Sequence, residues 1–440
     1  MKRGRFAAAI RRSPFLSGLQ EYPTTELIAA GIGILAVLLA LIFMLVPFPS
    51  GRPELTTSAP LSVGSPQFLD ALAAVTNSSV RFGDRVEPVQ NGDGFLAALE
   101  ASIPRAKHSI NFEDFIWYDG EFSDHVFDLL TAAAMRGVEV RVLVDAQGAK
   151  LPDDKVKALK AAGGKVELFR PNSIFSLNRI NARSHRRTMV IDGTEGYLGG
   201  VAIADDWLGN GTDPNKWRDM MFRVHGDMAE NLQDAFSTDW FETTGEVISG
   251  PDFFPTVAKG TVPYVPVVTE PTEYTTPVES LYVLSIRSAT STIYITNPYF
   301  VPDVEMRNAL EDAARRGVDI RVLIPAPHSS PVHHASEASY SELLKSGIRI
   351  YEYPGLLHTK TLVADDIWSI IGSANLDNRS RAINEENDMG VSDPVLAKQL
   401  YATFASDTAT STEVTKDAWA KRAFWEYIPS RLSLLFVKQY

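Results

Sequence analysis

Two histidines occupy equivalent positions in a duplicated segment of this chain. One copy reads HRRTMVIDGTEGYLGGVAI from His185, and the other reads HTKTLVADDIWSIIGSANL from His358, 173 residues further on. In both copies a cation, Arg187 or Lys360, stands two residues after the histidine. Duplicated core packing would preserve the apolar positions but has no need of these polar ones. The two histidines are therefore predicted to act together in catalysis.

The spacing of each histidine and its cation suits chemistry at phosphorus. Extended backbone places residues i and i+2 on the same side of the chain, so each pair is expected to point into one cavity. A neutral imidazole can attack phosphorus and form a phosphohistidine, while the second imidazole donates a proton to the leaving oxygen and later accepts one from the incoming hydroxyl. The cations would stabilise charge on the non-bridging oxygens. The pattern predicts phosphodiester transfer that requires no metal and no cofactor.

An aspartate follows each histidine by seven residues, Asp192 in the first copy and Asp365 in the second. Both belong to the set of candidate catalytic residues. Because each lies an odd number of residues away and beyond a short strand, we expect these carboxylates to bind the turn rather than the phosphate.

A second internal repeat predicts the elements that carry these segments. Residues 136–144 read RGVEVRVLV and residues 316–324 read RGVDIRVLI, each after an alanine-rich stretch of helical character. Strands are predicted upstream of them, over residues 110–118 and 293–301. A strand, a helix and a parallel strand form a right-handed βαβ unit, here made twice. The predicted fold class is α/β, with two homologous lobes that are each a mixed β-sheet flanked by helices.

The composition excludes some kinds of chemistry. The 440 residues include no cysteine, which excludes disulfides, thiolate metal sites and cysteine nucleophiles. The formal net charge of −12 argues against a protein that binds nucleic-acid phosphates over a basic face, so no nucleic-acid partner is expected. The sequence carries no signal of the oligomeric state.

An uncharged apolar segment spans residues 27–48. As a helix it would reach about 33 Å, enough to cross the hydrocarbon core of a bilayer. Basic residues are frequent before it and only Arg52 follows it closely, which predicts a cytoplasmic N-terminus and catalytic lobes on the other side of the cell membrane. A cleaved signal peptide is the alternative interpretation.

These features predict the organisation of the whole chain. Residues 1–26 form a cytoplasmic basic segment, 27–48 a transmembrane anchor and 49–66 a linker. The first lobe covers residues 67–250, an inter-lobe linker 251–275 and the second lobe 276–408. Residues 409–440 form an amphipathic helical segment, which is expected either to lie on lipid or to pack against the lobes.

The second copy resembles the signature of the phospholipase D superfamily, which is H-x-K-x4-D followed by a small-residue pair and an asparagine. The matching residues are His358, Lys360, Asp365, Gly372, Ser373 and Asn375. Further stretches, among them NPYFVPD over residues 297–303 and GSANLDNRS over residues 372–380, resemble bacterial cardiolipin synthases in particular.

The resemblance implies roles for further residues. Carboxylates downstream of each copy, Asp219 and Glu386, would orient the catalytic imidazoles. His185 would be the nucleophile and His358 the general acid and base. The candidate substrate-binding residues are Asn375, Ser373, Gly199 and Gly200.

The first copy departs from the family signature, with Arg187 in place of lysine and Ala202 in place of asparagine. The leading interpretation is a cardiolipin synthase-like phosphatidyltransferase that acts at a membrane on phosphatidylglycerol or a similar phospholipid. The alternatives are a hydrolytic phospholipase D, an exported phospholipase D-type nuclease, and a lipid-binding scaffold with a degraded first half-site. The same two imidazoles would serve water and every alcohol acceptor, so the sequence leaves the acceptor open.

Overall fold

A computed structural model describes residues 31–35, 37, 54–171, 182–270, 276–326 and 331–422. The chain divides into two units, Met1–Pro53 and Glu54–Tyr440. In the first unit the described residues, 31–35 and 37, are helical, and most of the predicted anchor at 27–48 lies outside the described residues. Over the ranges just given, no helix has both the length and the apolar character that crossing a bilayer requires.

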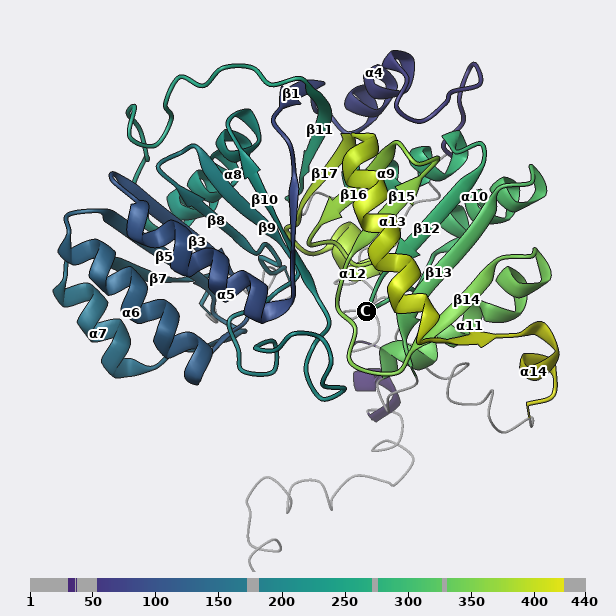
Figure 1. The fold of residues 1–440 in the computed structure, drawn as a ribbon. Coiled ribbons are helices and arrows are strands. Elements are labelled where there is room, and N and C mark those ends of the chain that lie inside the picture. Colours follow the sequence, from purple (N-terminus) through teal and green to yellow (C-terminus); the bar gives the residue numbers. More distant parts are fainter. Residues whose placement is uncertain are drawn as a thin grey trace, which may run out of the picture. The chain divides into compact units, whose positions relative to one another are not determined.

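The described part of the second unit contains two large mixed sheets, each covered by helices (Figure 1). The strand order in the first sheet is β2 (Glu87–Gln90), β10 (Met220–His225), β9 (Glu195–Gly199), β8 (Thr188–Ile191), β3 (Ser109–Asp114), β5 (Glu139–Asp145) and β7 (Lys165–Phe169). Strands β3, β5 and β7 are parallel, whereas β8, β9, β10 and β2 are antiparallel to their neighbours. A short sheet pairs β4 (Trp117–Tyr118) with β6 (Ala149–Lys150).

The second sheet repeats this arrangement and extends it at both edges. Its order is β1 (Arg81–Gly83), β11 (Val262–Val268), β17 (Asn387–Ser392), β16 (Trp368–Gly372), β15 (Thr361–Ala364), β12 (Thr292–Thr296), β13 (Asp319–Pro325), β14 (Arg349–Tyr353) and β18 (Thr412–Val414). Strands β12, β13 and β14 are parallel, as β3, β5 and β7 are. The prediction of a mixed α/β fold is confirmed.

Helices connect the parallel strands as the repeat predicts. Helix α6 (Glu121–Met135) joins β3 to β5 and α7 (Asp153–Ala161) joins β5 to β7. In the second lobe α10 (Val304–Arg315) and α11 (Pro331–Lys345) have these places. The Arg-Gly-Val segments form the turns between α6 and β5 and between α10 and β13. The remaining helices are η1 (Ile103–Arg105), α4 (Pro66–Val75), α5 (Asn91–Ser102), α8 (Asp227–Thr244), α9 (Pro277–Ser288), α12 (Asn378–Ala382), α13 (Pro394–Ala409) and α14 (Lys416–Ala420).

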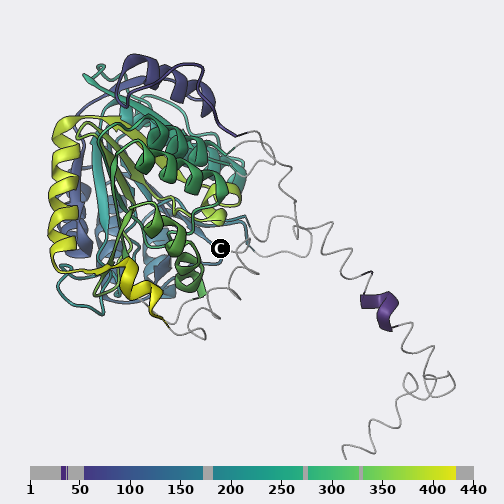
Figure 2. The same ribbon diagram turned by 90° about the vertical axis from the view of Figure 1, so that its right-hand side faces the viewer.

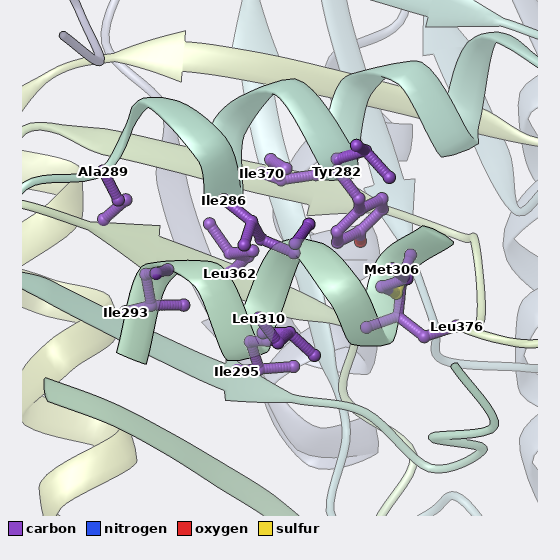
Figure 3. Close-up of a cluster of buried hydrophobic side chains, with 14 of the residues drawn as sticks. Tyr282, Ile286, Ala289, Ile293, Ile295, Met306, Leu310, Leu362, Ile370 and Leu376 are labelled. Atoms are coloured by element: carbon purple, nitrogen blue, oxygen red, sulfur yellow. The ribbon is translucent and has the colours of Figure 1, made fainter. Parts of the chain in front are cut away.

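The alternation of residues along β12 shows how each sheet acquires two buried faces. Ile293 and Ile295 pack with Leu310 of α10 in one apolar cluster (Figure 3), whereas Tyr294 belongs to another. Successive residues of a strand point to opposite faces, so this single strand contributes to both. A side view shows α9 and α10 on one side of the second sheet and α13 on the other (Figure 2).

One buried apolar cluster contains residues from both sheets. Its members from the first sheet include Val190, Leu198 and Phe222, and those from the second include Leu323, Ile371 and Met389. All six side chains are buried. The apolar area removed from water there holds the lobes in one relative position.

The predicted lobe boundaries are wrong at three places. Residues 66–83, assigned to a linker and the first lobe, form α4 and β1, and these elements belong to the second lobe. The predicted inter-lobe linker contains β11, which pairs with β17. Residues 412–414, predicted as helical, form β18 at the edge of the second sheet. Long-range strand pairing decides all three, and a reading of local composition does not detect it.

Candidate active site

His185 lies just before β8 and is held by the other lobe. Its backbone N–H donates to the carbonyl oxygen of Glu385, with 2.9 Å between nitrogen and oxygen. Its Nδ1 lies 3.0 Å from Oε2 of Glu386, which directly precedes β17 of the second sheet. Both side chains are buried. The carboxylate of the second lobe therefore orients the imidazole of the first.

His358, just before β15, has the reciprocal arrangement. Its backbone N–H donates to the carbonyl oxygen of Arg218 over 2.8 Å. Its Nδ1 lies 2.7 Å from Oδ2 of Asp219, which directly precedes β10 of the first sheet. Parallel bridges between Ser184 and Glu385 and between Arg218 and Leu357 link the lobes next to the two imidazoles. The carboxylates thus orient the histidines crosswise, which the sequence does not reveal.

The two cations complete a buried cluster. Nη1 of Arg187 lies 3.3 Å from Nε2 of His185, and Nζ of Lys360 lies 2.8 Å from Nδ1 of His358. Each cation also donates to the backbone carbonyl oxygen of its own histidine. The charge of Lys360 helps to lower the pKa of His185, and that of Arg187 helps to lower the pKa of His358. Charges from both lobes therefore act on both imidazoles.

Burial sets the protonation of the imidazoles. It lowers the pKa of His185, and it lowers the pKa of His358 to about 3 together with the charge of Lys360. Burial also lowers the pKa of Lys360 to about 7. Burial alone would raise the pKa of Asp219, but the charges of His358 and Lys360 hold it near 2. At neutral pH the cluster thus holds neutral imidazoles beside ionised carboxylates.

A second layer of hydrogen bonds fixes the orienting carboxylates. The Ser373 hydroxyl donates to Oε2 of Glu386 over 2.6 Å, so one oxygen holds both a hydroxyl and an imidazole. The indole Nε1–H of Trp207 donates to Oδ2 of Asp219 over 2.8 Å. A Cβ on Gly200 would lie 2.3 Å from Oδ1 of Asp219, so any side chain there would collide with this carboxylate.

Other predicted site residues have different surroundings. Gly199 ends β9, where a Cβ would lie 2.4 Å from the carbonyl oxygen of Met220. Ala202 is buried in the apolar core of the first lobe. The amide Oδ1 of Asn375 is buried and accepts no hydrogen bond from any described residue. Substrate binding by Asn375 therefore stays a prediction, whereas close packing explains Gly199, against Met220 of β10, and Gly200, against the carboxylate of Asp219.

Asp192 and Asp365 do not join the cluster. Asp192 accepts hydrogen bonds from the backbone N–H groups of residues 107–109, which precede β3. Asp365 accepts them from residues 290–292, which precede β12. Both aspartates have positive φ angles, near 51°, in the turns after β8 and β15. Their assignment to the catalytic set is corrected, because both carboxylates bind the turns, as their spacing predicts.

Sequence reasoning missed the aromatic residues around the imidazoles. The rings of Trp207 and Trp217 each lie 5.4 Å from the His358 ring between centroids, and Phe115 lies 5.2 Å from the His185 ring. Trp207 also donates the hydrogen bond to Asp219 described above.

Two buried histidines, each oriented by a carboxylate of the opposite lobe and accompanied by a cation, define a bilobal phosphodiester-transfer enzyme. The family described as "Cardiolipin synthase, PLD-like domain" matches residues 99–240 and 282–408. The chain belongs to this family, a branch of the phospholipase D superfamily.

Similar proteins agree with this assignment. Cardiolipin synthase 2 of Bacillus cereus is 35% identical over 353 residues, which cover 78% of this chain and 68% of that protein. The major cardiolipin synthase ClsA of Bacillus subtilis is 33% identical over 357 residues, or 80% of this chain and 74% of that one. The crystal structure of a phosphatidylserine synthase from Haemophilus influenzae has the same fold, with a TM-score of 0.61 and 12% identity over 84% of this chain and 96% of that one.

The crosswise carboxylates generate a first prediction. Glu386→Gln and Asp219→Asn should each lower kcat for phosphodiester cleavage by about 10- to 100-fold, because the Nδ1–H of the opposite imidazole loses its anionic acceptor. Glu385→Gln is the matched control, since its side chain pairs with Arg170 and contacts neither imidazole. Equal losses in all three variants, measured as initial rates on folded protein, would show that the carboxylates act only on lobe packing.

The lowered pKa of Lys360 generates a second prediction. Its ammonium is charged below about pH 7 and neutral above it, so kcat/KM should fall by about tenfold per pH unit on the alkaline side of pH 7. Asp219, Arg187, Glu386 and Asp377 are the charged groups that act on it. Lys360→Arg should move this alkaline limb to higher pH, because a guanidinium stays protonated. An unchanged limb in the variant assigns the titration to another group.

Proposed function

We propose that this protein is a cardiolipin synthase-like phosphatidyltransferase that acts on phosphatidylglycerol through a phosphohistidine. The relatives that it matches are cardiolipin synthases by name. The observation that carries the proposal is the pair of buried imidazoles, each with its Nδ1 on a carboxylate of the other lobe. At His185 this contact keeps the proton on Nδ1 and leaves Nε2 for attack on phosphorus.

In the first half-reaction, Nε2 of His185 attacks the phosphorus of phosphatidylglycerol. A nitrogen–phosphorus bond forms, and the bond from phosphorus to the glycerol headgroup breaks. His358 donates a proton to the departing glycerol oxygen. The phosphodiester brings a negative charge beside His358, which favours the protonated imidazole that this step requires.

In the second half-reaction, a headgroup hydroxyl of another phosphatidylglycerol attacks the same phosphorus. His358, now neutral, accepts the hydroxyl proton, and the nitrogen–phosphorus bond to His185 breaks. Arg187 and Lys360 stabilise the non-bridging oxygens in both steps. Cardiolipin is released, and the protonation states return to those at the start.

Expression in cells that lack cardiolipin tests this function. We expect new cardiolipin by lipid chromatography, and none with His358→Ala, because that variant has no group to protonate the leaving glycerol. Phosphatidic acid in place of cardiolipin would identify water as the acceptor and a hydrolytic phospholipase D. Cleavage of single-stranded DNA without a lipid change would identify a nuclease. A wild type as inactive as the variant would identify a scaffold.

We propose in addition that residues 27–48 anchor the protein in the cell membrane, with the lobes outside the cytoplasm. The absence of charge in this segment and the excess of Lys and Arg before it support the proposal. A C-terminal fusion to alkaline phosphatase should be active and a fusion to green fluorescent protein dark, since the first requires export and the second does not fluoresce after it. The opposite pattern would place the lobes in the cytoplasm.

A further inference from the structure

The two lobes surround their cations differently. Asp114 is the last residue of β3 and Asn297 directly follows β12, at equivalent places in the two sheets. Asp114 accepts hydrogen bonds from the backbone of Ile116 and Ile203, at 3.2 and 3.3 Å. Asn297 uses its Oδ1 for the same two contacts in the second lobe, both at 3.1 Å. An amide is therefore sufficient for this task, and the ionisable carboxyl of Asp114 requires another explanation. Burial raises the pKa of this carboxyl to about 7, and the charge of Arg187 opposes that rise.

The carboxyl of Asp114 lies beside Arg187. Nε of Arg187 lies 3.9 Å from Oδ1 of Asp114, and both side chains are 1% exposed. Lys360, the cation of the second lobe, has neutral Asn297 at the equivalent position. The first lobe thus combines arginine with aspartate, and the second combines lysine with asparagine. The net charges differ accordingly, since Arg187 with an ionised Asp114 sums to zero, whereas a charged Lys360 with Asn297 sums to +1.

The cations also contact different ring nitrogens. Arg187 lies 3.3 Å from Nε2 of His185, whereas Lys360 contacts Nδ1 of His358. A guanidinium in a protein only donates hydrogen bonds, so Nε2 of His185 must be the acceptor. The proton of the neutral ring is then on Nδ1, which lies 3.0 Å from Glu386. His185 is held from both sides in the tautomer with a lone pair on Nε2.

We propose that Arg187, balanced by Asp114, is a positioning residue that holds His185 as the nucleophilic tautomer and so makes the two half-sites unequal. The inference rests on the proposed function for the attack of His185 on phosphorus. The inference explains by catalysis why the first copy has Arg187 where the family signature has lysine. When a phosphodiester enters, the guanidinium donates to a non-bridging oxygen and releases Nε2 for attack.

The experiment is a pre-steady-state burst with bis(p-nitrophenyl) phosphate. Its leaving group departs without a proton, so the burst rate reports the attack of His185 and not the acid function of His358. Arg187→Lys should lower the burst rate by about tenfold and change KM by less than about twofold, because the loss is in chemistry and not in binding. Asp114→Asn alone should lower it by about threefold.

The double variant Arg187→Lys/Asp114→Asn decides the matter. It reproduces the lysine–asparagine combination of the second lobe, so its burst should recover to within about threefold of the wild type. A double variant no faster than Arg187→Lys, or a single variant with the wild-type burst, overturns the proposal. Cardiolipin formation is measured in parallel, so a wild type with a normal burst and no cardiolipin contradicts the proposed function alone.

Arg186→Lys is the control for loss of a buried guanidinium. Arg186 is fully buried, pairs with Asp239 over 2.6 Å and donates to the carbonyl oxygen of Thr269. We expect a lower melting temperature and a burst within about twofold of the wild type per folded molecule. A tenfold loss here, equal to that of Arg187→Lys, would overturn the proposal by showing that any buried arginine matters equally.

Discussion

The crosswise hydrogen bonds between each histidine and the carboxylate of the other lobe are the constraint on which the site depends. Glu386 orients His185 and Asp219 orients His358, so neither lobe alone contains an oriented imidazole. A buried imidazole without its partner would lose both its orientation and its preferred tautomer. The apolar core between the sheets and the backbone bridges near both histidines keep these distances short. The catalytic geometry therefore requires that the two lobes pack in this one arrangement.

Much of this arrangement could be predicted because the sequence contains an internal repeat. The mixed sheets, the Arg-Gly-Val turns and the pairing of His185 with His358 all follow from the repeats. The pairing of each histidine with a carboxylate of the other lobe could not be predicted, because spacing along the chain does not show which lobe a carboxylate faces. The places of α4, β1 and β11 depend on pairing between distant segments, and composition gave no sign of it.

The two orienting carboxylates show which interactions the chemistry requires. Glu386 accepts a hydrogen bond from the hydroxyl of Ser373, and Asp219 accepts one from the indole of Trp207. The carboxylate is retained in both half-sites, whereas its donors differ in size and type. A hydrogen bond to the carboxylate is thus the shared requirement, and the identity of the donor is free to follow the space around it.

The same reasoning separates the tasks of the two cations. A phosphodiester needs positive charge at both half-sites, and lysine and arginine each supply it. They differ in where they donate, since the planar guanidinium reaches Nε2 of His185 and the ammonium remains at Nδ1 of His358. One ring must attack while the other transfers protons, so a chemically symmetric pair would leave both rings fit for either role. The difference between Arg187 and Lys360 removes that ambiguity, and the carboxyl of Asp114 lies beside the guanidinium of Arg187.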